Sequence, residues 1–484
     1  MPEIPIDIGF YESSSLSLAA QNCINHYPQN PQTKGAVSTG ALFATPGMSQ
    51  FSIAGAGPGR GYNVFNGELF VISGAGFFKV SKTGVATSLG TISGTDRVIT
   101  SNNGITICIQ VPGGSGYFYD LANGLQEITD PVYQDFQAQA GGVTSVTYKD
   151  GYFVFTTEFE FFLSSLVVTN GGRDFNGLDF GTAEVKPDRN VLAANIKNEL
   201  YIIGTDSIQL FQNTGASGFP FQTIIGATID KGVASRHSFI EFDNSFVFVG
   251  GGIGESIAVW RGLSGSASKI STAAIDHALQ QYSEDEISNI FAWTYTEDGN
   301  FFVGFGLPDT TFVYDATIST IQGRPVWHER QSNRSAWRAN HIIDVYAKNY
   351  VLDAIDGRVG WLDRKITTEY GSDITREFTG AYIYNAGKSF TISLVELKTE
   401  SGVGNEKGTG HGENPQVELL ISVNNGKLFQ SVGSRSLGTF GQYDARQIWQ
   451  RMGKSENTAL LRFITTGESI LNYTNLIVNL KGGV

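Results

Sequence analysis

The chain has 484 residues, of which 41% are hydrophobic and 12% aromatic, enough to bury a large core in roughly two or three domains. Only 16% are charged and 59 are glycine, a balance typical of short strands joined by tight turns and unlike that of a helical or disordered protein. The formal charge of −13, without any Lys/Arg run, argues against tight sequence-specific DNA binding.

The first residues, Met1 to Pro5, contain neither the basic nor the apolar segment of a signal peptide. No apolar stretch approaches the roughly 18 residues that a membrane-spanning helix needs. We therefore expect a protein that is made in the cytoplasm and has no direct membrane insertion. Residues 1–50 are rich in Pro, Ser, Asn and Gln and show little periodicity, which predicts an extended N-terminal arm.

A short polar turn followed by an alternating apolar strand recurs along most of the chain after this arm. Asn-Gly and Asp-Gly tolerate the positive φ that two-residue hairpin turns require, and the β-branched and aromatic residues after them suit a buried strand. A second strand follows most of these turns, so each unit is at least a β-hairpin. The seven copies begin at Asn66, Asn103, Asp150, Asn198, Asp243, Asp298 and Asn349.

Successive copies begin 37 to 55 residues apart, close to the roughly 40 to 50 residues of a four-stranded propeller blade. Closing such units into a ring leaves few exposed strand edges, which is a physical advantage over an open sheet. The repeat therefore predicts an all-β protein with a β-propeller over residues 51–370. Seven blades match the count of copies, and six is the alternative.

One helical insertion interrupts the repeats near residues 272–291. Ile275, Leu279 and Tyr282 follow the spacing i, i+4, i+7 of an amphipathic helix. Thr272 can cap its start, and Ser283 with Glu286 reads as a capping box for a second short helix. We expect this insertion to lie between two blades.

The last part of the chain, residues 371–484, changes to longer alternating strands, which predicts a separate C-terminal β-sandwich. Its irregular stretch, Ser401 to Asn414, is glycine-rich and polar and is expected to be a mobile loop. The predicted strands are 379–384, 390–397, 417–423, 459–465 and 473–480.

No motif in the sequence forms a catalytic, cofactor-binding or metal site, so we predict none of these and no enzyme activity. Gly387-Lys388-Ser389 echoes the end of a phosphate-binding loop, but the glycine required five positions earlier is Tyr382. The run from Gly55 to Gly61 never satisfies GxGxxG, and there is no GxSxG nucleophile elbow. Glu284, Asp285 and Glu286 are adjacent and cannot face each other across a glycosidase cleft.

Histidine, cysteine and tryptophan fit structural roles better than chemical ones. The histidines show no ligand spacing, and Cys108 lies in an apolar run that predicts a buried free thiol. Six tryptophans could serve as sugar platforms, yet most lie in strand patterns and are expected in the core. The histidines are His26, His237, His277, His328, His341 and His411, and the tryptophans are Trp260, Trp293, Trp327, Trp337, Trp361 and Trp449.

A series of short segments, distributed over most of the chain, carries a likeness to one protein family. The segments are Gln21-Asn22 through Tyr27-Pro28, Thr45-Pro46-Gly47, Arg60-Gly61, Ile275 through Tyr282, Asp298-Gly299, Val313-Tyr314-Asp315, Ser422 to Gly426, Tyr443, Trp449 to Gly453 and Leu461-Arg462-Phe463. In these segments the sequence resembles the packaged-DNA stabilisation family, the tail accessory or nozzle proteins of short-tailed (podovirus-type) bacteriophages. It departs from the family pattern at Lys454-Ser455-Glu456, where further basic residues are expected.

The resemblance implies a virion tail protein, made in the host cytoplasm, that forms a homo-hexameric ring below the portal and head-to-tail adaptor. Such a ring would extend the DNA channel, help to retain packaged DNA and support tail needle or plug proteins and tail fibre or tailspike proteins. Double-stranded DNA would pass without sequence-specific binding, because a surface poor in Lys/Arg forms few phosphate contacts. The alternatives are a glycan-binding or glycan-processing propeller of a phage or bacterial surface and a generic propeller scaffold.

Overall fold

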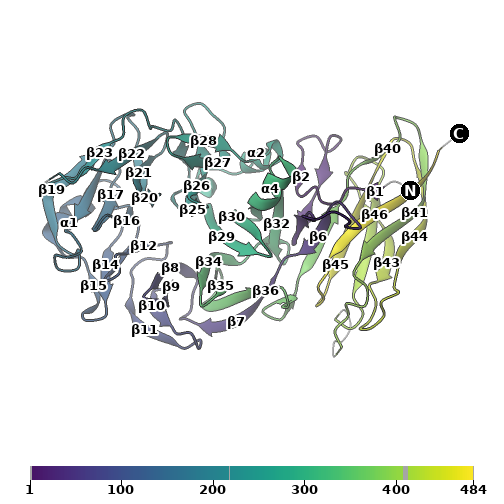
Figure 1. The fold of residues 1–484 in the computed structure, drawn as a ribbon, viewed down its shortest axis with the longest axis horizontal. Coiled ribbons are helices and arrows are strands. Elements are labelled where there is room, and N and C mark those ends of the chain that lie inside the picture. Colours follow the sequence, from purple (N-terminus) through teal and green to yellow (C-terminus); the bar gives the residue numbers. More distant parts are fainter. Residues whose placement is uncertain (1–2, 217, 407–411, 483–484) are drawn as a thin grey trace.

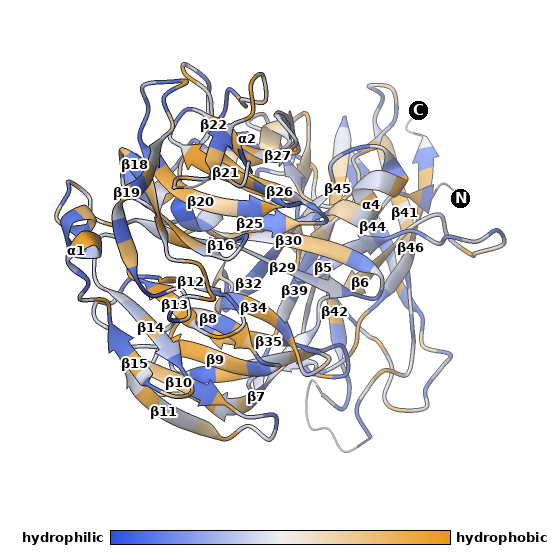
Figure 2. Ribbon diagram, turned by 60° about the vertical axis from the view of Figure 1, so that its left-hand side comes forward, coloured by the Kyte–Doolittle hydropathy of each residue, from blue (hydrophilic) through white to orange (hydrophobic). Residues whose placement is uncertain are grey.

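A computed structural model describes residues 3–216, 218–406 and 412–482. It contains a β-propeller and a β-sandwich side by side, with the propeller on the left and the sandwich on the right in Figure 1. Figure 2 shows stretches of hydrophobic residues along many of the blade strands, as expected for sheets that pack face to face. The predicted all-β class, with an N-terminal propeller and a C-terminal sandwich, is confirmed.

Seven sheets in the described residues form the blades. The strands nearest the centre of the propeller, such as β8, β12, β29 and β34, come from the start of their blades (Figure 1). Blades 1 to 4 are simple four-stranded meanders: β8 (Gly59–Phe65) to β11 (Ala86–Thr91), with β9 (Glu68–Ser73) and β10 (Gly76–Val80); β12 (Ile99–Asn102), β13 (Ile107–Gln110), β14 (Gly116–Asp120) and β15 (Gly124–Glu127); β16 (Ser145–Lys149), β17 (Tyr152–Thr156), β18 (Glu160–Ser164) and β19 (Phe175–Thr182); β20 (Asn190–Ile196), β21 (Glu199–Gly204), β22 (Ile208–Asn213) and β23 (Phe221–Thr223).

The remaining blades carry extra strands. Blade 5 holds β24 (Gly232–Val233), β25 (Ile240–Phe242), β26 (Ser245–Gly251), β27 (Ala258–Leu263) and β28 (Ser266–Lys269), with the short 3-10 helix η1 at Arg236–Ser238. Blade 6 holds β29 (Phe291–Glu297), β30 (Asn300–Gly306), β31 (Thr311–Asp315), β32 (Trp327–Ser332) and β33 (Ser335–Ala336). Blade 7 holds β34 (Ala339–Val345), β35 (Lys348–Asp353), β36 (Arg358–Asp363), β7 (Gly47–Ile53), β37 (Thr368–Glu369) and β38 (Ser372–Asp373).

The repeated polar turns join the first and second strands of the blades. Asn66 and Asp298 have φ of 54° and 47°, and the glycines that follow them also have positive φ, as two-residue hairpin turns require. The seventh unit differs from the prediction. Its turn is formed by Tyr346 and Ala347, with φ of 54° and 59°, and Asn349 lies within β35. The backbone there adopts the turn geometry without the residues that usually signal it.

The sandwich consists of two sheets around one apolar core. One sheet has the order β44 (Gln447–Ser455), β41 (Phe390–Thr399), β46 (Tyr473–Gly482), β6 (Ala41–Ala44) and β5 (His26–Gln29), and β1 (Glu3–Ile4) also pairs with β46. The other has β39 (Thr375–Thr379), β45 (Thr458–Thr466), β42 (Gln416–Ser422) and β43 (Gln430–Ser436), and β40 (Ile383–Tyr384) pairs with β45. The sequence patterns missed β43 and β44, and part of the expected mobile loop, residues 407–411, lies outside the described residues.

The helical insertion is confirmed between blades 5 and 6. The Thr272 hydroxyl accepts a hydrogen bond from the Ile275 amide at the start of α2 (Ala273–Leu279). Ser283 and Glu286 form the reciprocal capping box of α3 (Glu284–Ser288). Two further helices were not predicted, α1 (Pro131–Gln137) and α4 (Ala316–Gln322). Each is capped by an aspartate, Asp130 for α1 and Asp315 for α4.

The N-terminal segment, expected over residues 1–50 as an extended arm with at most one strand, contains several short strands. Besides β1, β5 and β6 in the sandwich, β2 (Tyr11–Glu12) pairs with β3 (Ala20–Gln21) and β4 (Cys23–Ile24) lies between the two domains. Strand β7 is antiparallel to β36 and completes blade 7, so the start and the end of the propeller sequence share one sheet. The domain boundaries at residues 50 and 370 stay predictions, and β7 runs across the first of them.

Closure of the ring through β7 can be tested with two substitutions in that strand. Met48 is 1% exposed and packs in the core between blades 6 and 7, whereas Ile53 is 58% exposed. Met48→Ala removes buried apolar volume from the closing strand and is expected to lower the free energy of unfolding by about 2–5 kcal/mol. Ile53→Ala is the matched control, with an expected change within about 0.5 kcal/mol. Urea unfolding followed by tryptophan fluorescence measures both, and equal losses would contradict closure through a packed β7.

Candidate functional site

The motifs that the sequence analysis rejected lie in ordinary structural positions. Gly387, with φ of 74°, is part of the turn between β40 and β41 rather than a loop that leads into a helix. The run from Gly55 to Gly61 leads into β8. Glu284, Asp285 and Glu286 form the exposed first turn of α3, where carboxylates are favoured by the helix dipole. None of these segments brings together groups that could perform a reaction.

The tryptophans do not form open platforms for sugars. Trp293, Trp327, Trp337 and Trp449 are at most 2% exposed, as predicted. The two that are half-buried are covered by lysines. The ammonium of Lys231 lies 4.7 Å from the ring centre of Trp260, and that of Lys348 lies 3.4 Å from the ring centre of Trp361.

The histidines are spread over three environments. His26 and His328 are fully buried at the junction of the two domains, and His237 and His341 line a cavity on the propeller axis. His277 lies on α2, and His411 falls outside the described residues. No group of three or more His, Cys, Asp or Glu suited to a metal ion is found in the described ranges. Cys23 and Cys108 are both buried free thiols, as predicted for Cys108.

A continuous sheet joins the propeller to the sandwich through the two-residue strand β4. Ile24 of β4 is parallel to Glu329 of blade 6 on one side and antiparallel to Glu377 of the sandwich on the other. The result is an 11-stranded sheet that runs through both domains. Backbone hydrogen bonds along this sheet resist relative motion of the domains, because any rotation would break the ladder.

Asn25 fastens this junction with its side chain. Its Nδ2 donates hydrogen bonds to the carbonyl oxygens of Gln331 at 3.0 Å and Thr375 at 2.8 Å, and its Oδ1 accepts one from the Gln331 amide at 3.0 Å. Asn25 has a φ of 55°, a conformation that asparagine tolerates better than most residues. One residue of the N-terminal segment thus contacts both domains.

Glu329 is an unusual carboxyl group at this junction. It is 8% exposed, and its Oε1 accepts a hydrogen bond from the Thr310 hydroxyl at 3.0 Å. Burial, together with the negative charges of Glu12, Glu377 and Asp309, raises the pKa of Glu329 to about 8. The carboxyl is therefore largely protonated near pH 7. It faces no nucleophile or metal ligand set in the described chain, so its environment indicates packing rather than catalysis.

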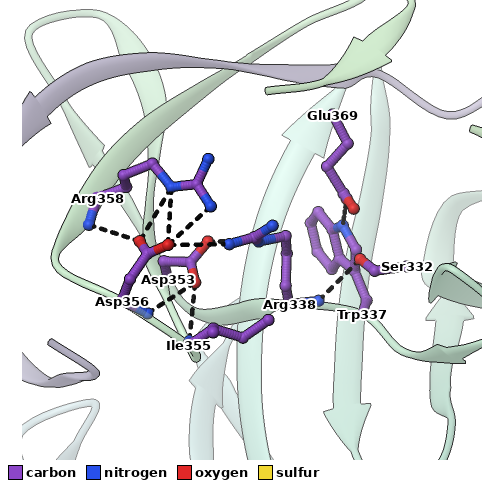
Figure 3. Close-up of polar contacts among 8 residues, drawn as sticks. All are labelled: Ser332, Trp337, Arg338, Asp353, Ile355, Asp356, Arg358 and Glu369. Atoms are coloured by element: carbon purple, nitrogen blue, oxygen red, sulfur yellow. Dashed lines mark hydrogen bonds and ion pairs between the residues drawn. The ribbon is translucent and has the colours of Figure 1, made fainter. Parts of the chain in front are cut away.

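A second polar cluster lies where β7 closes blade 7 (Figure 3). The Arg338 Nε donates to Asp353 Oδ2 at 2.6 Å, and the Asp353 Oδ1 accepts the amide of Ile355 at 2.8 Å. Asp356 lies between the guanidinium groups of Arg338, at 3.4 Å, and Arg358, at 2.7 Å. The hydrogen bond from Arg358 lowers the pKa of Asp356. Every charge in this cluster is neutralised by a neighbour, which is typical of a structural network.

The same cluster anchors β37, the strand that lies beside β7. Trp337 Nε1 donates to Glu369 Oε1 at 2.9 Å, and Glu369 is the parallel partner of Met48 in β7. Burial raises the pKa of Glu369. Sequence analysis did not find this cluster because its members come from separate segments with no motif spacing. Its only local signal is the Asp-x-x-Asp turn between β35 and β36.

Large apolar side chains are exposed at many places on the described surface, and these include both ends of the molecule. Blade 3 carries Phe159 at 57%, Val168 at 86% and Leu178 at 80% exposure, and β19 lies at the end of the propeller opposite the sandwich (Figure 1). Loops of the sandwich carry Phe440 at 61% and Tyr443 at 75%. Exposed apolar surface of this kind is typical of protein contacts. Among the described helices, none is long and apolar enough to span a membrane.

Comparisons with known proteins agree with this two-part architecture. A family model described as the β-propeller of bacteriophage P22 Gp10 matches residues 2–367, and one described as its β-sandwich matches residues 375–481. The tail hub protein gp10 of Salmonella phage P22 is 22% identical over 437 residues, which are 86% of each chain.

Two solved structures align over most of the chain at low similarity. The N-terminal domain of Nup159 has 11% identity and a TM-score of 0.38, with 71% of this chain and 99% of that one covered. PorZ of Porphyromonas gingivalis has 8% identity and a TM-score of 0.36, with 72% of this chain and 45% of that one covered.

Glu329 makes stability depend on pH. Its pKa of about 8 in the folded chain exceeds the ordinary value of 4.5, so the folded state keeps a proton that the unfolded state loses between these values. The contribution is fully present below about pH 4.5 and is lost as pH rises towards 8. Glu329→Gln cannot lose a proton and so avoids this loss. The thermal midpoint of the variant minus that of the wild type should therefore be roughly 5 °C larger at pH 8 than at pH 5. Glu456→Gln, at an exposed position, is the control, and a pH-independent difference would contradict the assignment.

Arg338 should matter more than a surface cation, because its partner Asp353 is fully buried. Arg338→Gln leaves that carboxylate without its counter-charge and is expected to cost about 3 kcal/mol in urea unfolding. Adding Asp353→Asn should recover part of the loss. Lys454→Gln breaks an exposed ion pair with Glu456 and should cost less than about 1 kcal/mol. Equal losses for Arg338→Gln and Lys454→Gln would refute a structural role for the buried pair.

Proposed function

The chain belongs to the bacteriophage P22 Gp10 family, and on that premise we propose that it is a structural protein of a short phage tail, located in the virion tail. The observation that carries the proposal is the match of both domain models, in order, to residues 2–367 and 375–481. The relative named a tail hub protein aligns over 86% of its own length, so both domains have counterparts in it.

In this proposal, the chain assembles as a ring of six copies below the portal and the head-to-tail adaptor. The ring prolongs the DNA channel, helps to retain packaged DNA and supports the needle and the fibres or tailspikes. Two features support such a role. The continuous sheet through β4 gives a stiff two-domain body, and exposed apolar side chains at both of its ends offer surface for contacts with neighbours.

The charge of the chain supports passage of DNA without tight binding. A formal charge of −13 and the pairing of many arginines with carboxylates leave few cations for phosphate contacts. A structural role also fits the polar cluster around Arg338 and Asp353, in which the charges of the side chains are neutralised by one another. The glycan alternative loses its main support, because four of the six tryptophans are buried and the other two are covered by lysines.

DNA retention gives the functional test. DNA-filled heads that carry the adaptor but lack this chain are expected to lose DNA, measured as nuclease-sensitive DNA, and addition of the purified chain should restore protection. Heads that retain DNA equally well with and without the chain would overturn the proposed role in retention. Binding of sugars by the isolated chain, with heads unaffected, would favour the glycan alternative.

Assembly should depend on the apolar edge of blade 3. Leu178→Glu places a charge on a side chain that is 80% exposed, so the isolated chain stays folded while a buried contact in the tail is disrupted. We expect its incorporation into tails to fall at least about tenfold, as a charge buried without a partner costs more than 1.4 kcal/mol. Val37→Glu is the control, at a side chain that is 92% exposed in the N-terminal segment. Undiminished incorporation of Leu178→Glu would exclude this edge from the contacts.

A further inference from the structure

A cavity of about 380 Å³ lies on the propeller axis, among the inner strands of the blades. Its lining comes from six of the seven blades, including β8, β12, β20, β25, β29 and β34, which surround the centre of the propeller in Figures 1 and 2. Five cationic or titratable side chains of the described residues line it: Tyr62, Arg97, Arg236, His237 and His341. No carboxylate is part of the described lining.

Arg97 is held firmly in this cavity. Its Nη2 donates to the carbonyl oxygen of Asn340 at 2.9 Å, and its Nη1 donates to His341 Nε2 at 3.0 Å. The guanidinium carbon lies 3.7 Å from the centre of the Phe291 ring. All three partners are neutral, and Arg97 has no ion pair in the part of the chain that the structure describes. Burial lowers the pKa of Arg97 to about 9, so the group keeps its charge at pH 7.

Arg236 offers unused donors. Its Nε donates to the carbonyl oxygen of Val191 at 3.3 Å, whereas its two Nη atoms form no hydrogen bond with described residues. The carboxylate that acts on the charge of Arg236 is that of Glu158. Glu158 is already paired with another arginine, because its carboxylate lies 3.5 Å from the guanidinium of Arg189. Two guanidinium groups therefore share one cavity without a carboxylate of their own. Buried charges in proteins are ordinarily paired, so the missing partner calls for an explanation.

The histidines add neutral N–H donors beside these charges. Burial and the charges of Arg97 and Arg236 lower the pKa of His237 to about 3, and burial with Arg97 lowers that of His341. Both rings are neutral at pH 7, so each keeps one N–H group. Because His341 Nε2 accepts the bond from Arg97, its hydrogen lies on Nδ1, which is buried without a partner in the described chain.

We propose that the axial cavity binds a tetrahedral oxyanion of the phosphate class, held by the guanidinium groups of Arg236 and Arg97 and by the N–H group of His237. The free Nη atoms of Arg236 form a planar fork that matches two oxygens of such an anion. The anion supplies the charge that the lining lacks. A cavity of about 380 Å³ has room for it together with several waters, each of which takes about 30 Å³. The site lies within one chain and does not depend on the proposed function.

Titration of the full-length chain with inorganic phosphate tests this site, with chloride used to hold the ionic strength constant. We expect a saturable rise of the thermal midpoint, about 2 °C or more at 20-fold excess over the dissociation constant, and a matching isothermal titration signal. Chloride alone should give no saturable rise. A nucleoside monophosphate, titrated in the same way, distinguishes free phosphate from a phosphate attached to a larger molecule, and the tighter ligand identifies the source.

Variants locate the binding. Arg236→Gln and, separately, Arg97→Gln should each weaken phosphate binding at least about tenfold. Arg451→Gln, at an exposed arginine of the sandwich, is the matched control and should bind as the wild type does. Circular dichroism in chloride buffer checks that each variant is folded. If a variant is not folded, the phosphate titration of the wild type alone decides whether the site exists. Failure of the wild type to bind phosphate, or equal binding by folded Arg236→Gln, would overturn the proposal.

Discussion

Pairing of strand edges is the constraint on which this structure depends. A seven-bladed array has a first and a last blade, and each exposes an edge until the ring closes. Here the N-terminal strand β7 closes it by pairing with β36, and the neighbouring β4 pairs with both β32 and β39. About fifty N-terminal residues therefore join the two ends of the propeller and also join the propeller to the sandwich. Neither junction is complete until this segment has paired.

The buried polar residues follow from the same constraint. Where strands from distant segments meet, polar side chains become trapped and must find partners. Asn25 satisfies backbone groups of both domains, and Arg338 neutralises Asp353 where blade 7 closes. Glu329 forms no ion pair with a described residue, and its raised pKa keeps it largely protonated. Buried polar groups are thus stabilised either by a partner or by protonation. Both arrangements indicate that these residues have structural rather than catalytic roles.

The sequence predicted features that local residues determine. Short polar turns located six of the seven blade hairpins, and four of these turns are Asn-Gly or Asp-Gly. Thr272 with Ser283 located the helical insertion. The seventh turn was misplaced because Tyr346 and Ala347 carry no turn signal. Contacts between residues that are distant in sequence could not be predicted, since no spacing rule connects β7 with β36 or His237 with His341. The family resemblance came from many weak segments spread along the chain, and the family models match residues 2–367 and 375–481.

Electron microscopy of the purified chain mixed with DNA-filled, adaptor-bearing heads tests the central claim most directly, namely that this rigid two-domain chain is a component of a phage tail. The account predicts a closed ring of copies below the adaptor, with density for DNA along the ring axis and both domains in the relative orientation that β4 fixes. Heads that remain unchanged, together with a chain that stays monomeric, would contradict it.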